Sequence, residues 1–383
     1  MSLQFIFGNS GSGKSHYLYQ QIVEESIRHP EKNYLVLVPE QFTMQTQKDL
    51  CMAHPRGGIM NIDVLSFGRL AHRVFEETGK ERQPILDDEG KNLVLRKIAG
   101  NYEDELTVLK GNLKKQGYIS EVKSVISEFT QYGIDFEQLD SFMEGLNSES
   151  YLYYKLKDIR KVYEGFEDYL RDKYITKEEL LDVLSQTVPE AKMLKDSVIA
   201  MDGFTGFTPV QNRLIGELLK VCDKIMLTVE MDRREDPFVY KHPYQLFALS
   251  KQMVTSLTEV AQEVKVEIDE PVWLCKNPPY RFKENPEMAF LEEELFRYSR
   301  RKYSGEKMQS ISLHEVHTPQ EEAQYVAEEI RRLVREEGYR YREIAVIASD
   351  LSTYADALEK ACDRYEIPVF MDHKKSILLN SFV

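Results

Sequence analysis

The chain has few cysteines, and they lie far apart. The four are Cys51, Cys222, Cys275 and Cys362, and no two of them form a C-x-x-C pair. Zinc sites and disulfide frameworks need closely spaced or regularly repeated cysteines. The spacing therefore argues against both. It suits a reducing compartment, in which each cysteine is a small buried hydrophobic residue.

Long hydrophobic runs are also missing. Hydrophobic residues make up 42% of the 383 residues. No segment approaches the roughly 20 consecutive apolar residues that a membrane-spanning helix needs. The first residues do not show the basic and then apolar pattern of a secretory signal. We therefore expect a cytoplasmic protein, and its length predicts two or three domains.

Positive charge is outnumbered by negative charge. Lys and Arg total 50 against 64 Asp and Glu, which gives a net charge of −14 at pH 7. This balance weakly disfavours nucleic acid as a partner, but a local basic channel is compatible with it because binding depends on where the charge lies. Lys110, Lys114 and Lys115 form a small basic cluster that we interpret as a solvated face. Residues 296–303 alternate basic and aromatic side chains, and we interpret them as an exposed linker.

A phosphate-binding loop stands near the start of the chain. It lies between an apolar segment at 3–7, which predicts a strand, and an amphipathic segment at 16–28, which predicts a helix. Its glycines let the backbone wrap around an anion, and its amides and the positive helix end face that anion. Lys14 is predicted to reach the β- and γ-phosphates of a nucleotide, and Ser15 to ligate Mg²⁺. The loop consists of Gly8, Asn9, Ser10, Gly11, Ser12, Gly13, Lys14 and Ser15, and it fits G-x-x-x-x-G-K-[ST] at every fixed position.

The pattern of strands and helices predicts an α/β protein with an insertion. Strand-like and helix-like segments alternate over the first 80 residues, which predicts a parallel sheet covered by helices. Apolar residues then recur at three- and four-residue spacing, which predicts helices alone. We predict a P-loop NTPase (RecA-like) domain with a parallel sheet at 1–82 and 187–300, an all-helical insertion at 83–186, and the start of a second RecA-like α/β domain at 301–383, with strands at 311–316, 344–348 and 369–371.

The second predicted domain stops at Val383 without the further strands that such a sheet needs. We therefore expect the chain to be the first part of a longer protein.

Asp202 is the predicted acidic partner of the loop. It follows an apolar segment at 198–201 that predicts a buried strand. A carboxylate at this position holds Mg²⁺, often through water, together with the loop Ser15. The next residue is Gly203 rather than a glutamate that would polarise an attacking water. Nucleotide binding is therefore better supported than hydrolysis. The alternative interpretation of Asp202 is a turn residue after a strand.

Several segments match the motifs of one helicase superfamily, in the same order along the chain. They are the loop at 8–15, the strand and turn at 35–43, Val-Leu-Ser-Phe at 64–67 with Arg69, Asp-Gly-Phe at 202–204 with Gln211, and the segments at 321–326 and 344–347. Together they resemble superfamily 1 DNA helicases of the UvrD and RecB type. Asp-Gly-Phe is similar to a worn form of the Asp-Glu-x-Gln-Asp motif, and the resemblance implies that Gln211 contributes to the nucleotide site.

The same resemblance implies an edge that contacts DNA. Thr43, Ser66 and nearby backbone amides are expected to contact DNA phosphates, and Arg69 adds a positive charge. Phe42 and Phe67 carry rings that can stack on bases. For each of these aromatic residues, a place in the core is at least as good an interpretation.

The sequences of three segments resemble a single family more closely than they resemble the superfamily as a whole. Val-Pro-Glu-Gln-Phe-Thr at 38–43, Ser-Phe-x-Arg-Leu at 66–70 and Asp-Gly-Phe-x-x-Phe-Thr-Pro-x-Gln at 202–211 resemble the AddB family of bacterial helicase–nuclease subunits. The resemblance implies ATP and Mg²⁺ as ligands, and double-strand ends and single-stranded DNA as substrates. It also implies an AddA subunit as heterodimer partner in end resection and Chi reading for homologous recombination. An iron–sulfur cluster is implied only for a C-terminal nuclease part that this chain does not contain. We therefore expect neither nuclease activity nor unwinding from the chain alone.

Two other functions stay open beside this resemblance. Another P-loop enzyme, such as a nucleotide or small-molecule kinase, fits the loop but not the long helical insertion and the second α/β unit. A non-hydrolysing, nucleotide-dependent recognition module fits the loop and Gly203. His314 and His317 lie on a predicted strand, where their side chains would not converge, so we do not interpret them as a metal site.

Overall fold

The computed structural model divides into two units, Met1–Tyr303 and Ser304–Val383. The predicted boundary between residues 82 and 83 lies outside the described residues, and so does the end of the predicted second domain at 372–383. The described residues are 1–79, 84–171, 173–305 and 308–371.

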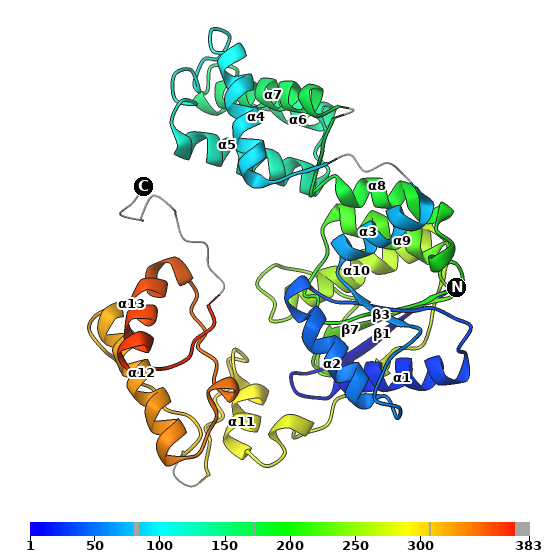
Figure 1. The fold of residues 1–383 in the computed structure, drawn as a ribbon, viewed down its shortest axis with the longest axis vertical. Coiled ribbons are helices and arrows are strands. Elements are labelled where there is room, and N and C mark those ends of the chain that lie inside the picture. The colour runs from blue at the N-terminus through cyan, green and yellow to red at the C-terminus, as the bar shows by residue number, and fades with distance from the viewer. Residues whose placement is uncertain (80–83, 172, 306–307, 372–383) are drawn as a thin grey trace. The chain divides into compact units, whose positions relative to one another are not determined.

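A parallel sheet forms the centre of the first unit (Figure 1). The strand order is β3-β2-β6-β7-β1-β8, and β9 also pairs with β1. Every pairing is parallel, so the carboxyl ends of the strands meet at one edge, where open α/β sheets bind their ligands. The predicted α/β class with a mainly parallel sheet is thereby confirmed. The strands are β1 (Ser2–Gly8), β2 (Tyr34–Leu37), β3 (Ile62–Leu65), β6 (Val198–Met201), β7 (Lys224–Glu230), β8 (Glu267–Ile268) and β9 (Val272–Trp273).

Helices cover both faces of this sheet. Ile6 of β1 packs with Leu18 and Ile22 on one face, whereas Phe5 and Phe7 point to the other face. Burial on both faces explains why the strands are almost continuously apolar instead of alternating. The first face carries α1 (Lys14–Arg28) and α2 (Thr43–Ala53), and the second carries α3 (Phe67–Thr78), α8 (Leu180–Thr187), α9 (Pro209–Leu219) and α10 (Ala248–Glu263).

A second hydrophobic core belongs to the insertion. Its helices bury residues at three- and four-residue spacing, such as Ile119, Val122 and Ile126. The carboxylate of Asp158 is buried and accepts the backbone N–H groups of residues 107–109, which holds an irregular segment onto a helix. The helices are α4 (Asp88–Asn101), α5 (Gln116–Tyr132), α6 (Phe136–Glu144) and α7 (Tyr151–Leu170).

The prediction that the insertion is all-helical was wrong in one detail. Strands β4 (Ile85–Leu86) and β5 (Ile175–Thr176) pair in parallel where the chain enters and leaves the helical core. Each strand has two residues, which is too short to give a period-2 pattern in the sequence.

The second unit has two α-helices but lacks the strands of the predicted α/β domain among its described residues. It contains α12 (Pro319–Glu336) and α13 (Leu351–Arg364), which pack through Ala327, Leu358 and Cys362. Among residues 304–305 and 308–371, none is in a strand, so the predicted strands at 311–316, 344–348 and 369–371 were wrong. These segments are apolar, but a strand needs a hydrogen-bonded neighbour. Their side chains are largely exposed instead, as at Leu313 (98%) and Ile347 (94%).

Shorter helical turns connect these elements. None of the helices in the described part of the chain is both long and apolar enough to span a bilayer. The remaining helical segments are α11 (Pro286–Glu294), η1 (Glu40–Phe42), η2 (Val188–Glu190), η3 (Lys192–Leu194), η4 (Tyr280–Phe282) and η5 (Tyr341–Glu343).

A buried carboxyl group makes the stability of the insertion depend on pH. Burial, and then the nearby Glu179 carboxylate, raise the pKa of Glu167 from 4.5 to about 7. The folded state therefore holds this proton more tightly than the unfolded state, and stability falls as pH rises through this range. We expect Glu167→Gln to stabilise the protein by about 1–2 kcal/mol at about pH 8, after a discount for partial exposure, and by little at about pH 4.5. Melting curves followed by circular dichroism at both pH values measure the difference.

Glu164→Gln is the matched control, because Glu164 lies on the same helix and pairs with Arg160 at 3.1 Å near solvent. An equal gain for both variants at high pH would contradict the assignment to Glu167.

Candidate functional site

The phosphate-binding loop lies at the carboxyl edge of the sheet. Strand β1 ends at Gly8, and α1 begins at Lys14. Gly13 caps this helix with φ of 93°, a left-handed conformation that side chains other than glycine rarely adopt. A Cβ atom placed on Gly13 would have no neighbour within 4 Å, so the space in front of the helix is open. The predicted strand, loop and helix are therefore all present, with an open N-terminal end.

Two side chains of the loop have hydrogen-bonding capacity left for a ligand. The Ser12 hydroxyl is buried and makes no hydrogen bond to any described residue. The Lys14 ammonium has three donors, of which one is given to the Asn9 carbonyl at 3.0 Å. Burial lowers the pKa of Lys14, and the carboxylates of Glu230 and Asp202 oppose this shift. A partly buried cation with two remaining donors beside a helix N-terminus fits the phosphate group of a nucleotide.

The structure brings Ser15 and Asp202 together, although they are 187 residues apart in the sequence. The Ser15 hydroxyl donates to Asp202 Oδ1 at 3.1 Å. Thr228 on β7 donates to the same oxygen at 2.5 Å, and Tyr19 on α1 donates to Oδ2 at 2.7 Å. Three hydroxyl groups therefore hold a carboxylate that is only 7% exposed. Metal binding by Ser15 and Asp202 stays a prediction, and their contact fits it.

Sequence reasoning missed Tyr19 and Thr228. Tyr19 lies one helical turn after Ser15, and its hydroxyl also lies 3.3 Å from the Thr46 hydroxyl on α2. Burial and the Asp202 charge raise the pKa of Tyr19, so it stays a neutral donor. The i, i+4 spacing from Ser15 was a usable signal for Tyr19. A single threonine in an apolar strand was a weak signal for Thr228.

Gly203 directly follows Asp202 and has φ of 77°. A Cβ atom here would lie 3.6 Å from Pro39 Cδ and 3.7 Å from Phe42 Cδ2. The backbone conformation thus favours glycine at the position where a glutamate would polarise an attacking water.

Gln211 is part of a helix cap. Thr208 and Gln211 form a capping box at the start of α9, and the Thr208 N–H donates to Gln211 Oε1 at 2.9 Å. The amide oxygen of Gln211 is therefore engaged within its own helix. A contact between Gln211 and a nucleotide stays a prediction.

Two of the five residues predicted to contact DNA are buried and bonded locally, and a third, Phe42, is 48% exposed. Thr43 is 6% exposed, and its hydroxyl donates to the Glu40 carbonyl at 3.0 Å. Ser66 is also 6% exposed, and its hydroxyl accepts the Arg69 N–H at 3.3 Å as the N-cap of α3. Both hydroxyl groups thus serve the ends of helices.

The other two residues of this set differ in exposure. Phe67 is 8% exposed and packs against the rings of Phe204 and Phe207, with centroids 5.5 and 6.3 Å away. Its ring is therefore part of the core. The Arg69 side chain is exposed to solvent.

A segment from the end of the first unit lies against the loop, and its role was not predicted. Leu274 N–H donates to the Phe7 carbonyl at 2.8 Å, and Arg281 N–H donates to the Gly11 carbonyl at 3.0 Å. This places the exposed Arg281 beside the phosphate-binding loop. The residues before Arg281 are irregular, with two consecutive prolines, so no periodic pattern marked this contact.

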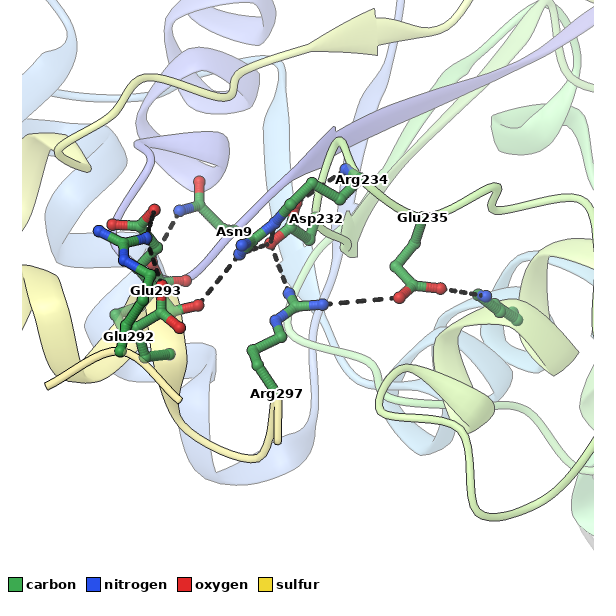
Figure 2. Close-up of polar contacts among 10 residues, drawn as sticks. Asn9, Asp232, Arg234, Glu235, Glu292, Glu293 and Arg297 are labelled. Atoms are coloured by element: carbon green, nitrogen blue, oxygen red, sulfur yellow. Dashed lines mark hydrogen bonds and ion pairs between the residues drawn. The ribbon is translucent and has the colours of Figure 1, made fainter. Parts of the chain in front are cut away.

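An ionic network next to the loop was also missed (Figure 2). Asn9 of the loop donates through Nδ2 to Glu292 Oε2 of α11 at 3.0 Å. Asp232, which follows β7, accepts from Arg234 and Arg297. The contacts of Asn9 with Glu292 and of Asp232 with Arg297 join residues that are far apart in the sequence, so neither has a local signal.

No group of three or more His, Cys, Asp or Glu side chains suited to a metal ion occurs in the ranges that the structure describes. A magnesium ion at Ser15 and Asp202 would therefore take its other ligands from phosphate oxygens and water, as Mg²⁺ commonly does.

Comparisons with known proteins agree on one group. A family profile described as "ADDB, N-terminal" matches residues 5–292. The chain is 41% identical to a protein of Lachnoclostridium phytofermentans that is named as a subunit of an ATP-dependent helicase/deoxyribonuclease, over 100% of this chain and 34% of that protein. It is 33% identical to the protein of the same name from Clostridium perfringens and 31% identical to that from Alkaliphilus oremlandii, over 100% of this chain and 33% of each relative. The chain thus spans about a third of the length of the curated relatives that it matches.

The Tyr19 hydroxyl is expected to stabilise the site. Tyr19→Phe removes one of three donors to a buried carboxylate, and we expect a loss of about 1–3 kcal/mol in the free energy of unfolding. Urea unfolding followed by fluorescence of the single tryptophan, Trp273 on β9, measures it. Tyr17→Phe on the same helix is the control, since the Tyr17 hydroxyl makes no hydrogen bond to a described residue. Equal stability of the two variants would argue against a supporting role for Tyr19.

Proposed function

The chain belongs to the AddB N-terminal family, and on this premise we propose that it is the nucleotide-binding part of the AddB subunit of an ATP-dependent helicase/deoxyribonuclease. One observation carries the proposal. An intact phosphate-binding loop places Ser15 within 3.1 Å of the buried Asp202, as a site for a nucleotide with Mg²⁺ requires.

The residues of this chain have separate roles in that site. The amides of the loop and the N-terminus of α1 bind phosphate oxygens, and Lys14 adds a partly buried positive charge. The hydroxyl of Ser15 and the carboxylate of Asp202 hold Mg²⁺, directly or through water. When bound, Mg²⁺ neutralises phosphate charge. Tyr19 and Thr228 hold the Asp202 carboxylate in place.

We further propose that this site binds ATP and hydrolyses little of it. The residue after Asp202 is Gly203, with a left-handed backbone, and Pro39 and Phe42 lie close to where a side chain would project. No carboxylate stands there to orient an attacking water. The motor is therefore degenerate in this proposal.

DNA is the second proposed ligand. Exposed Arg69 and the backbone around Thr43 and Ser66 would contact DNA phosphates. Phe42, which is 48% exposed and lies beside Gly203, is better placed than the buried Phe67 to stack on a base.

The family supports a wider role for the whole protein. We propose a cytoplasmic heterodimer with an AddA subunit that resects double-strand breaks for homologous recombination, with Chi recognition assigned to the AddB subunit. An iron–sulfur cluster would belong to a part of the protein outside this chain. The nuclease activity would belong there as well.

A second candidate function is favoured by Gly203. The chain would be a DNA-recognition module whose bound nucleotide is never hydrolysed and only sets its conformation. Another kind of P-loop NTPase has less support, because the family profile covers most of the chain.

The loop lysine tests nucleotide binding. We expect the chain to bind ATP·Mg²⁺ and Lys14→Ala to abolish binding, because Lys14 is the cation of the phosphate-binding loop itself. Titration with a fluorescent ATP analogue measures both. Lys32→Ala is a control elsewhere in the first unit, since Lys32 pairs with Asp223 at 2.6 Å. Identical titration curves for the wild type and Lys14→Ala would refute the site.

The rate of ATP hydrolysis tests whether the motor is degenerate. We expect negligible ATP hydrolysis by the chain, with or without single-stranded DNA, because Gly203 supplies no carboxylate. Continuous measurement of released phosphate checks this. A turnover of several per second that disappears in Lys14→Ala would show that another residue activates water.

A further inference from the structure

Helix α11 places a carboxylate against the phosphate-binding loop. Glu292 Oε2 accepts a hydrogen bond from Asn9 Nδ2 at 3.0 Å, and Asn9 is the second residue of the loop. The Glu292 charge also acts on Lys14, together with those of Glu230 and Asp202. A negative group thus already lies among the donors and the cation that the proposed function assigns to phosphate.

The ionic network holds the stretch that carries Glu292 (Figure 2). Arg234 bonds to the Asp232 carboxylate through Nη2 at 2.6 Å and to the Glu293 carbonyl through the same nitrogen at 3.0 Å. Arg297, three residues after the end of α11, also donates to Asp232. Both arginines therefore tie this stretch to the end of β7, so Glu292 is fixed beside Asn9.

A second layer supports Arg297. Its guanidinium lies 3.5 Å from Glu235 and over the ring of Phe247. Glu235 in turn pairs at 2.6 Å with Lys251 of α10, which is 3% exposed. Of Arg297, Glu235 and Lys251, only Lys251 is buried, but breaking either pair leaves a charge without its partner. The network therefore keeps Glu292 beside Asn9 when no nucleotide is bound.

Only one of the two polar atoms of the Asn9 side-chain amide has a hydrogen-bond partner among the described residues. Its Nδ2 atom bonds to Glu292, but its buried Oδ1 atom has no hydrogen-bond partner among the described residues. An unsatisfied buried polar atom is uncommon, and this one is free to accept a hydrogen bond from a ligand or water at the loop.

The surroundings of Glu292 disfavour its negative charge. Burial raises the pKa of Glu292, the Asp232 and Glu230 carboxylates raise it further, and the Asn9 amide and Arg297 oppose the shift. The Glu292 charge in turn opposes the lowering of the Lys14 pKa. The ionic network keeps the Glu292 carboxylate beside the loop, although its surroundings disfavour the negative charge.

We propose that Glu292 is a built-in counter-charge that competes with nucleotide phosphate for the loop, so that α11 lowers and regulates nucleotide affinity. This rests on the proposed function. Carboxylate and phosphate oxygens are both anionic acceptors, so they compete for the Asn9 amide and repel each other across Lys14. Binding of ATP·Mg²⁺ releases Glu292 from Asn9 and loosens α11. Its contact with the loop is an autoinhibitory one.

Neutralising Glu292 tests the proposal. Glu292→Gln keeps the shape and an acceptor for Asn9 but removes the charge. We expect this variant to bind a fluorescent ATP·Mg²⁺ analogue roughly three- to tenfold more tightly than the wild type at about pH 7.5. The ratio should move towards one at about pH 5.5, because the raised pKa of Glu292 favours proton uptake by the wild-type carboxyl as pH falls. The ratio of the two proteins at each pH cancels the titration of the nucleotide.

Glu293→Gln is the matched control. Glu293 is the next residue of the same helix, and its carboxylate pairs with Arg301 at 3.0 Å instead of contacting the loop. We expect it to bind like the wild type at both pH values. Equal or weaker binding by Glu292→Gln, with binding by the wild type and its loss in Lys14→Ala, would overturn the counter-charge and leave the nucleotide site standing. No binding by any of the proteins would overturn both.

Hydrogen exchange on the unmodified chain gives an independent readout. We expect the backbone amides of residues 287–294 to exchange faster with ATP·Mg²⁺ than without it, and no such change in Lys14→Ala. Slower exchange in the presence of nucleotide would show that α11 closes onto the ligand, which contradicts release.

Discussion

The buried carboxylate of Asp202 is the constraint on which the site depends. An ionised carboxylate that is 7% exposed is tolerated only when its oxygens are hydrogen-bonded. Its donors are hydroxyl groups from two other elements, Ser15 and Tyr19 on α1 and Thr228 on β7. The strand order makes this possible, because β7 lies between β6 and β1 and so brings Thr228 alongside. The register of the central strands and the seating of α1 are therefore fixed by the same group.

Local features of the fold were predictable from the sequence because they depend on neighbouring residues. The caps at Ser66 and Thr208 use a side chain and a backbone amide three residues apart, and both are present. The phosphate-binding loop is likewise contained in eight consecutive residues. The strands predicted in the second unit were wrong for a related reason. Apolar runs such as 344–348 show β propensity, but propensity does not supply the neighbouring strand that a ladder needs.

The parts of the site that were not predicted join segments that are distant in the sequence. Thr228 meets Asp202 across 26 residues, and Glu292 meets Asn9 across 283. No spacing rule reaches that far. Motif resemblance also failed to indicate exposure. It selected Ser66 and Phe67 as residues that contact DNA, whereas the structure uses one as a helix cap and the other in an aromatic cluster. A motif preserves residue types, and the same type can serve the backbone or a ligand.

Acidic side chains also surround the lysine of the phosphate-binding loop. Lys14 lies among the charges of Glu230, Asp202 and Glu292. An isolated nucleotide would add several more negative charges to this set, and repulsion in a partly buried site is poorly screened. A divalent cation between Ser15 and Asp202 reverses that balance, because it neutralises phosphate and carboxylate together. In the proposed function, these carboxylates would therefore make the site selective for a metal-bound nucleotide over a free one. Glu292 contacts Asn9 and is not one of the residues proposed to hold the metal, so its charge would not be neutralised in this way. In this proposal, Asp202 favours the metal at one end of the loop, whereas Glu292 repels phosphate at the other end.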